Sequence, residues 1–116
     1  MSAADTFDLN AKDRAMALAF SPDGNYLAVG HNQSPFFTLL DHTSAGSLSA
    51  ADTQVISANG VEQVVFSPDG KYIAIGHNST TSTKFTLLDH TTAGSVSISD
   101  TFTGTGIVYG VSFSAN

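Results

Sequence analysis

The chain has no cysteine, very few basic residues and a single glutamate, and each scarcity narrows the chemistry open to it. Without cysteine, neither a disulfide framework nor a thiolate zinc site can form. The 116 residues include four Lys plus Arg against ten Asp plus Glu, for a formal net charge of −6 at pH 7. Phosphate backbones and anionic lipid repel such a charge, so we expect no binding to nucleic acid or to membranes. A paired-carboxylate hydrolase would have to rely on aspartate, because Glu62 stands alone.

Long apolar runs and a leader peptide are also missing. No stretch approaches the roughly 18 apolar residues of a membrane-spanning helix. Residues 1–5 lack the basic and apolar segments that open a signal peptide. We therefore expect a soluble protein of unknown compartment, cytoplasmic by default. With 41% apolar and only 12% charged residues, the chain is expected to fold rather than to be disordered.

A long internal repeat is the main feature that is present. Phe20-Ser21-Pro22-Asp23-Gly24 returns 46 residues later at 66–70, and Thr38-Leu39-Leu40-Asp41-His42-Thr43 returns 48 residues later at 86–91. This period is typical of arrays of four-stranded blades or other stacked units. Such a unit cannot bury its apolar faces alone, so the repeat predicts that units pack against neighbours.

The pattern within each repeat predicts four short strands and almost no helix. In the second repeat the expected strands are 61–66, 72–77, 85–89 and 95–102. We expect one blade at 15–53 and another at 61–102, within a propeller fragment that covers residues 1–116. Two pieces flank the blades: 2–7 repeats the outer strand, and 107–114 aligns with the inner strand. The predicted fold class is all-β, with four antiparallel strands in each blade.

The connections contain the residue types that tight turns require. In Ser-Pro-Asp-Gly the proline sets φ, the aspartate bonds nearby backbone, and the glycine adopts positive φ. The aspartate that follows each Leu-Leu pair is expected to cap the next turn. The predicted structural turn residues are Pro22, Asp23, Gly24, Pro68, Asp69, Gly70, Asp41 and Asp89.

Four histidines are the first candidates for a metal site. His31 and His77 end the second strands, and His42 and His90 follow the third. A third strand of about five residues, at about 3.3 Å each, separates its two ends by about 17 Å. One ion cannot span that distance. Because the chain also lacks a nucleophile elbow and a phosphate loop, we expect no metal, no cofactor and no catalytic residue.

The repeated motif resembles the WD-repeat β-propeller family over residues 15–100. The resemblance rests on Phe-Ser-Pro-Asp-Gly-x-Tyr-hydrophobic-Ala-x-Gly, a hydrophobic-Leu-Leu-Asp strand and Thr-x-Ala-Gly. Leu40 and Leu88 stand where the family has tryptophan, and Gly-His lies at 30–31 and 76–77, at the end of the second strand. The hydrogen-bonded tetrad of that family is therefore not carried over.

Two and a half blades are too few for a closed propeller, which has about four to eight. At about 25 cal/mol per Å² of apolar area, uncovered faces of several hundred Å² would cost about 10 kcal/mol. We expect copies of the chain to complete a ring, with strand exchange at the termini as one way to seal it. The same chain would also suit an excerpt of a longer propeller or a stack that does not close.

The polar loops after the second and fourth strands are the predicted binding surface. In propellers of this kind they share one face, and their neutral donors and acceptors suit sugars or peptide backbone. The candidate ligand or partner residues are His31, Asn32, Gln33, Ser34, His77, Asn78, Ser79 and Thr80. The favoured function is a non-catalytic, self-assembling interaction scaffold for a protein or glycan ligand. The alternatives are a glycan- or receptor-binding part of a surface or viral structure and an enzyme that uses the central channel.

Overall fold

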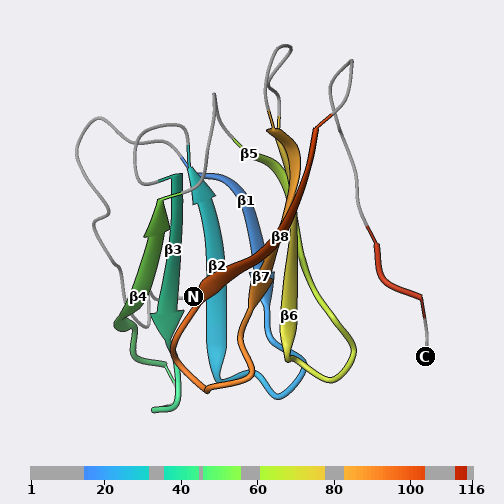
Figure 1. Ribbon diagram of the computed structural model, residues 1–116. Coiled ribbons are helices and arrows are strands. Elements are labelled where there is room, and N and C mark those ends of the chain that lie inside the picture. Colours follow the sequence, from blue (N-terminus) through green and yellow to red (C-terminus); the bar gives the residue numbers. More distant parts are fainter. Residues whose placement is uncertain are drawn as a thin grey trace.

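The computed structural model describes residues 15–31, 36–44, 46–55, 61–77, 83–103 and 112–114. The strand expected at 2–7 lies outside these residues, as does all of 107–114 except 112–114. The described part consists of strands and turns (Figure 1). No helix that could cross a membrane occurs among the residues placed by the structure.

Eight strands form two sheets of four. The strands are β1 (Ala15–Phe20), β2 (Tyr26–His31), β3 (Phe36–Asp41), β4 (Ser49–Val55), β5 (Val61–Phe66), β6 (Tyr72–His77), β7 (Thr83–Asp89) and β8 (Ser97–Thr103). They pair in the orders β1-β2-β3-β4 and β5-β6-β7-β8, with every neighbouring pair antiparallel. We call these sheets blade 1 and blade 2.

The two blades share their irregularities as well as their strand order. The pairing register shifts between Ala15 and Ala17 in β1 and between Val61 and Gln63 in β5. It shifts again between Leu39 and Leu40 in β3 and between Leu87 and Leu88 in β7. An extra residue at a bulge bends a strand locally, so equivalent bulges give the repeats the same curvature. The sequence repeat is therefore a repeat of backbone geometry.

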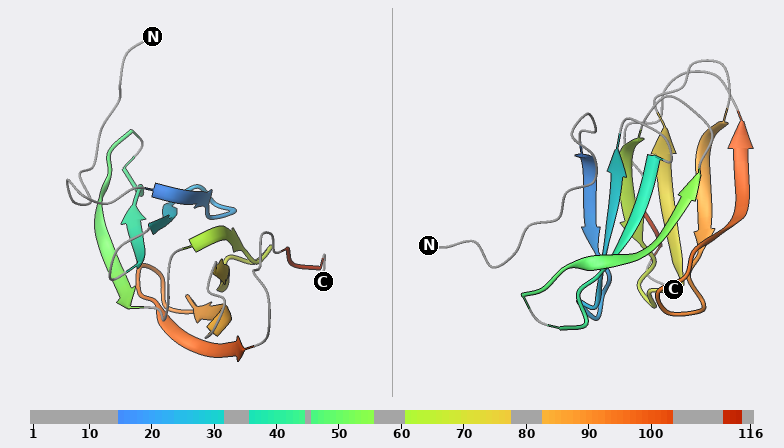
Figure 2. Two further views of the ribbon diagram at one scale, coloured as in Figure 1. Left: turned by 90° about the horizontal axis from the view of Figure 1, so that it is seen from above. Right: turned by 90° about the vertical axis from the view of Figure 1, so that its left-hand side faces the viewer.

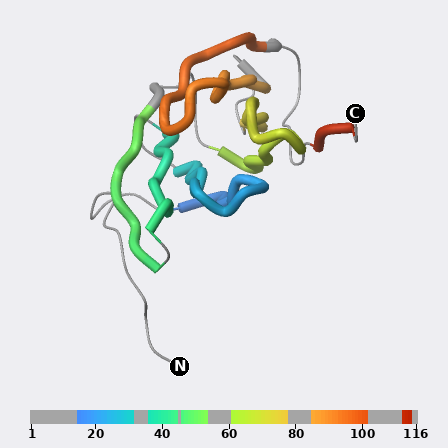
Figure 3. Tube along the Cα trace, turned by 90° about the horizontal axis from the view of Figure 1, so that it is seen from below, coloured from blue at the N-terminus to red at the C-terminus, as the bar shows by residue number. Residues whose placement is uncertain are grey.

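The core lies between the two blades. Strand β5 packs against β1 and β2, and the views along the strands show β1 and β5 side by side, with β4 and β8 at the outer edges (Figures 2 and 3). The buried cluster draws on both sheets and consists of Ala28, Phe37, Leu39, Val61, Val64, Phe66, Ile73, Ile75, Leu88 and Val96. Burial of each larger apolar side chain contributes about 1.5–3 kcal/mol, so each blade depends on the other.

The predicted fold class, all-β with four-stranded antiparallel sheets, is confirmed. The strands expected at 61–66 and 72–77 have those bounds in the structure. Strand β7 begins at 83 rather than 85, and β8 covers 97–103 rather than 95–102. Residues 95 and 96 instead belong to the preceding turn, where the amide of Ser95 bonds the carbonyl of Thr92 at 3.1 Å.

Candidate interaction surface

At one end of the sheets, the Ser-Pro-Asp-Gly turns are closed by their own side chains. The Ser21 hydroxyl donates to Asp23 Oδ1 at 2.6 Å, and the amide of Tyr26 donates to Ser21 Oγ at 3.0 Å. The second repeat has the same bonds, including Ser67 Oγ to Asp69 Oδ1 at 2.7 Å. Glycine closes both turns with φ of +78° and +75°. Side-chain hydrogen bonds and a glycine of positive φ thus close the turn in both repeats.

The aspartates of these turns serve as acceptors for nearby donors. The Ser21 hydroxyl and then the Asn25 amide hold the pKa of Asp23 below its usual value. The Lys71 amide and then the Ser67 hydroxyl do the same for Asp69. Hydrogen bonds to the charged form of a carboxyl favour that form. The two carboxylates therefore hold turns together.

A histidine joins the two turns at this end of each blade. His42 Nδ1 lies 3.0 Å from the Gly24 carbonyl, and the amide of Gly46 donates to His42 Nε2 at 3.0 Å. His90 makes the same bonds with Gly70 and Gly94, also at 3.0 Å. An amide only donates and a carbonyl only accepts, so the geometry requires the neutral imidazole with its proton on Nδ1. Both histidines therefore hold turns together through hydrogen bonds.

Asp41 and Asp89 cap the turns that follow β3 and β7. Asp41 Oδ1 accepts from the Thr43 hydroxyl at 2.6 Å and from the Thr43 amide at 2.7 Å. Asp89 accepts from Thr91 at the same distances. These bonds, the hydroxyl first, lower the pKa of both carboxyls from the ordinary value of 3.8. The two aspartates make equivalent bonds in the two repeats.

The lowered pKa values predict a loss of stability in acid. A carboxyl whose pKa is lower folded than unfolded contributes stability above its unfolded pKa and loses it as pH falls through the folded pKa. We expect the free energy of unfolding of the parent chain to fall as the pH drops below about 4. In the double variant Asp41→Asn, Asp89→Asn the fall should be shallower, because an amide oxygen still accepts from the threonines but does not titrate.

Urea unfolding of both chains across this pH range measures the effect. Other titrating groups are common to the two proteins and cancel in the difference. Parallel curves for parent and variant would show that these caps do not carry the acid sensitivity.

At the other end of the sheets, His31 and His77 lie inside the protein rather than in the loops. Each is 1% exposed at the end of its strand. Their Nε2 atoms lie 3.0 Å from Thr38 Oγ1 and 2.7 Å from Thr86 Oγ1. In this chain they cannot offer their rings to a ligand, which differs from the expectation. The other predicted loop residues, Asn32–Ser34 and Asn78–Thr80, lie outside the described part of the chain.

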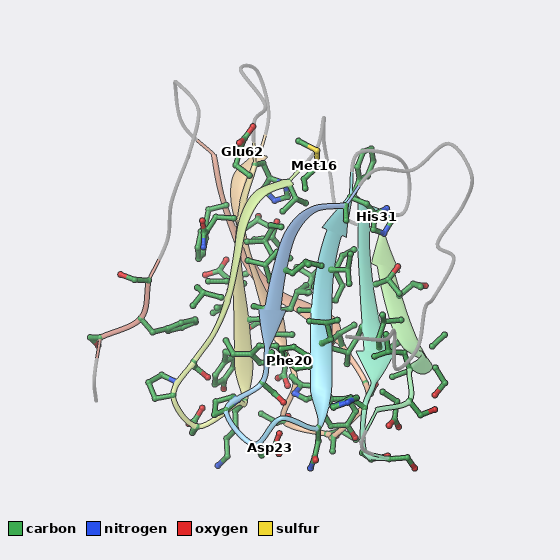
Figure 4. All side chains as sticks on the ribbon, turned by 180° about the vertical axis from the view of Figure 1, so that it is seen from behind. Met16, Phe20, Asp23, His31 and Glu62 are labelled. Atoms are coloured by element: carbon green, nitrogen blue, oxygen red, sulfur yellow. The ribbon has the colours of Figure 1, made fainter. Side chains whose placement is uncertain are left out.

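The labelled side chains show how the two ends differ. Asp23 lies at the closed turns, Phe20 lies nearer that end, and His31 and Glu62 lie toward the opposite end (Figure 4). Within the described ranges, no group of three His, Asp or Glu side chains could hold a metal ion.

The contact between the blades is made by residue positions that each occur in both repeats. The contact itself forms only once in the described structure, between blade 1 and blade 2. The ring of Tyr26 lies edge-on to His90, with centroids 5.0 Å apart. Asp52 of β4 accepts the amide of Val96 from blade 2 at 2.7 Å. Gly30 of β2 faces Val61 so closely that an added Cβ would lie 2.4 Å from Val61 Cγ1. Three kinds of contact therefore define one interface: aromatic, charged and close-packed.

The equivalent face of blade 1 points away from blade 2. Leu18 is 61% exposed and Phe20 is 56% exposed. Their counterparts in blade 2, Val64 and Phe66, are 2% and 7% exposed. An exposed pair of large apolar side chains on a face built to be covered marks an interaction surface.

Sequence reasoning did not identify the inter-blade pairs, although a signal for them was present. Tyr26, Gly30 and Asp52 each recur in the second repeat, at 72, 76 and 100. The repeat therefore marks these positions as constrained. It does not say which copy of one position meets which copy of another.

Comparison with known proteins supports the WD-type architecture. Residues 6–57 match the family model described as WD domain, G-beta repeat, which confirms the resemblance inferred from the sequence. A crystal structure of a functionally unknown protein from Desulfotomaculum acetoxidans DSM 771 has a similar fold, with a TM-score of 0.66 and 21% identity. The match covers 82% of this chain and 29% of that one. At this identity the likeness shows the fold alone. No curated protein matches the sequence significantly.

Proposed function

We propose that this chain, which carries a WD-type repeat and a second copy of it, is a non-catalytic interaction scaffold. Its repeats would present one loop face several times, through assembly with copies of the same chain. WD domains act in general as interaction modules, and the match at residues 6–57 supports that broad class. Repetition would turn weak single contacts into avidity without any new contact at each site.

The observation that carries the proposal is a structural difference between the two ends of the sheets. At the closed end, Asp23, Asp41 and His42 and their counterparts are engaged in hydrogen bonds that hold turns. The connections β2–β3, β4–β5 and β6–β7 leave from the other end, because every neighbouring pair of strands is antiparallel (Figure 1). Binding residues are disproportionately found on loops that a rigid scaffold positions. The loop end is therefore the better candidate for binding.

The sequence of the loops favours a neutral polar ligand. Asn32, Gln33 and Ser34 in the first repeat correspond to Asn78, Ser79 and Thr80 in the second. Their amides and hydroxyls can both donate and accept, which suits an extended peptide backbone or a sugar. A glycan- or receptor-binding role in a surface or viral structure is the second candidate, and the same side chains favour it.

Screening the purified chain on arrays of defined oligosaccharides and of extended peptides tests both candidates. We expect binding to one of them, reduced at least about tenfold in the double variant Asn32→Ala, Asn78→Ala, because both loops contribute. The matched control is Ser44→Ala, Thr92→Ala, which changes equivalent exposed positions at the closed end. A glycan hit would favour the second candidate. Binding that survives the loop variant and is lost in the control would contradict the proposal.

A further inference from the structure

The interface between blade 1 and blade 2 shows how this chain covers a blade. Blade 1 supplies Tyr26, Asp52 and the Pro22 turn, and blade 2 supplies His90 and Val96. Tyr26 also reaches Gly94, where an added Cβ would lie 3.3 Å from the tyrosine hydroxyl. Every one of these residue types recurs at the equivalent position of the other repeat, apart from Val96, which is Leu48. Each blade therefore has both halves of the contact.

Blade 2 packs on blade 1 through the surface that contains Phe66 and His90. Blade 1 has an equivalent surface, which contains Phe20 and His42 and has no blade packed on it in the part of the chain that the structure describes. The ring of Phe20 lies 5.7 Å from His42 at 61°, and Phe66 lies 5.9 Å from His90 at 70°. The two ring pairs are built alike. His90 receives a second ring, Tyr26, whereas no second ring contacts His42 within the described ranges.

The turn glycines show the same asymmetry. At Gly70, an added Cβ would lie 3.5 Å from Pro22 Cδ of the preceding blade. At Gly24, no atom of the described residues lies within 4 Å of that position, although the backbone conformation is the same. Together with the exposure of Leu18 and Phe20, this leaves one side of blade 1 open where blade 2 is covered.

Blade 2 has its own copy of the surface through which blade 1 contacts blade 2, and this copy makes no inter-blade contact in the part of the chain that the structure describes. Tyr72 is the counterpart of Tyr26, and no ring contact is made by it within the placed part of the chain. Asp100 is the counterpart of Asp52, and within the described residues it accepts a bond from the next amide, that of Thr101, at 2.8 Å. Asp52 makes that local bond with Thr53 and adds the bond to Val96.

We propose that a second copy of this chain docks head to tail, with blade 2 of one copy covering the open side of blade 1 of the next. Tyr72 of one copy then lies against His42 of the next, and Pro68 lies beside Gly24. Leu18 and Phe20 become buried as Val64 and Phe66 already are. The docking repeats, between molecules, the contact that the structure shows within one molecule.

This geometry favours a closed ring. The two docking sides differ, so the contact is heterologous and either closes by rotation or continues as a filament. The rotation from blade to blade is that of a propeller fold, and propellers close with about four to eight blades. With two four-stranded sheets in each chain, closure takes about two to four copies. The inference rests on the proposed scaffold role for its biological meaning, but its test reads mass rather than ligand binding, so either can fail without the other.

Native mass and a pair of complementary variants test the docking. We expect light scattering of the full chain to give two to four times the single-chain mass of 12.0 kDa. Phe20→Glu and Tyr72→Glu place a charge on opposite sides of the contact, and each should weaken association about a hundredfold. Ser99→Glu adds the same charge on the exposed edge strand β8 and should leave the mass unchanged.

Mixing the two variants separates head-to-tail docking from a symmetric contact. The Phe20→Glu chain keeps its Tyr72 side, and the Tyr72→Glu chain keeps its Phe20 side. An equimolar mixture should therefore form two-chain complexes that neither variant forms alone. Leu18→Glu replaces Phe20→Glu if circular dichroism shows that the latter does not fold, since Leu18 is the more exposed.

Three results would overturn the proposal. A parent chain that is monomeric and folded at micromolar concentration would show that the open side needs no second copy. An oligomer whose mass neither charge changes would place the contact elsewhere. Folded variants that stay separate on mixing would rule out the head-to-tail arrangement.

Discussion

Replacing Gly30 with alanine should destabilise the protein by about 3 kcal/mol, the upper part of the range for overpacking. The added Cβ would lie 2.4 Å from Val61 Cγ1 and 2.7 Å from Val61 Cβ, distances at which atoms cannot remain. Val61 is fully buried, so its side chain has no room to withdraw. Relief requires β2 and β5 to separate, which opens the core between the blades. Urea unfolding of Gly30→Ala against the parent measures the loss.

The sign of this effect identifies its cause. If only the backbone mattered, a glycine replaced by alanine in a strand would gain about 0.4–1 kcal/mol, because the unfolded chain loses freedom. A double-mutant cycle with Val61→Ala separates the two contributions, since that change removes both Cγ atoms and keeps Cβ. The cost of Gly30→Ala should fall by about 1 kcal/mol or more in that background. An equal cost in both backgrounds would contradict a clash with Val61.

The turns could be predicted from sequence because their chemistry is local. Ser21, Asp23 and Gly24 lie within four residues of one another, and the bonds that close the turn join near neighbours. Local geometry of this kind follows from residue type. The capping by Asp41 was predictable for the same reason, because its donor is Thr43.

The burial of His31 and His77 could not be predicted in the same way. Each follows a run of apolar and small residues and precedes a polar segment, so its sequence context is that of a strand end entering a loop. Their partners, Thr38 and Thr86, belong to the neighbouring strand. These contacts cross from one strand to the next, and the residue pattern along a single strand does not include them.

The inter-blade contacts lie still further from what a single repeat can show. Asp52 and Val96 are 44 residues apart and join different sheets. Asp100 is the counterpart of Asp52 and is likewise followed by threonine, yet it makes no such bond within the described part of the chain. Identical residues therefore differ in structure because one has a blade beside it. The sequence repeat predicts the surfaces, and the number of blades decides which of them are covered.

Phe37→Ala tests how strongly the two blades depend on each other. Phe37 of β3 is fully buried in the core between the sheets, and truncation of a buried phenylalanine costs about 3–5 kcal/mol. That range is comparable with much of the total stability of a small domain, so the variant should unfold at far lower urea concentration or fail to fold at all. Phe37→Leu keeps most of the apolar volume and should cost about 1 kcal/mol, which separates the cavity from a general sensitivity of the strand.

The second repeat supplies a matched comparison. Phe85 occupies the equivalent place in β7 but is only half-buried, because its side of blade 2 has no blade beside it in a single chain. With association blocked by Phe20→Glu, Phe85→Ala should therefore cost clearly less than Phe37→Ala. Equal losses of stability at the two positions would mean that burial between the blades does not determine the free energy of unfolding. The interface between the blades would then not be the main contribution to stability.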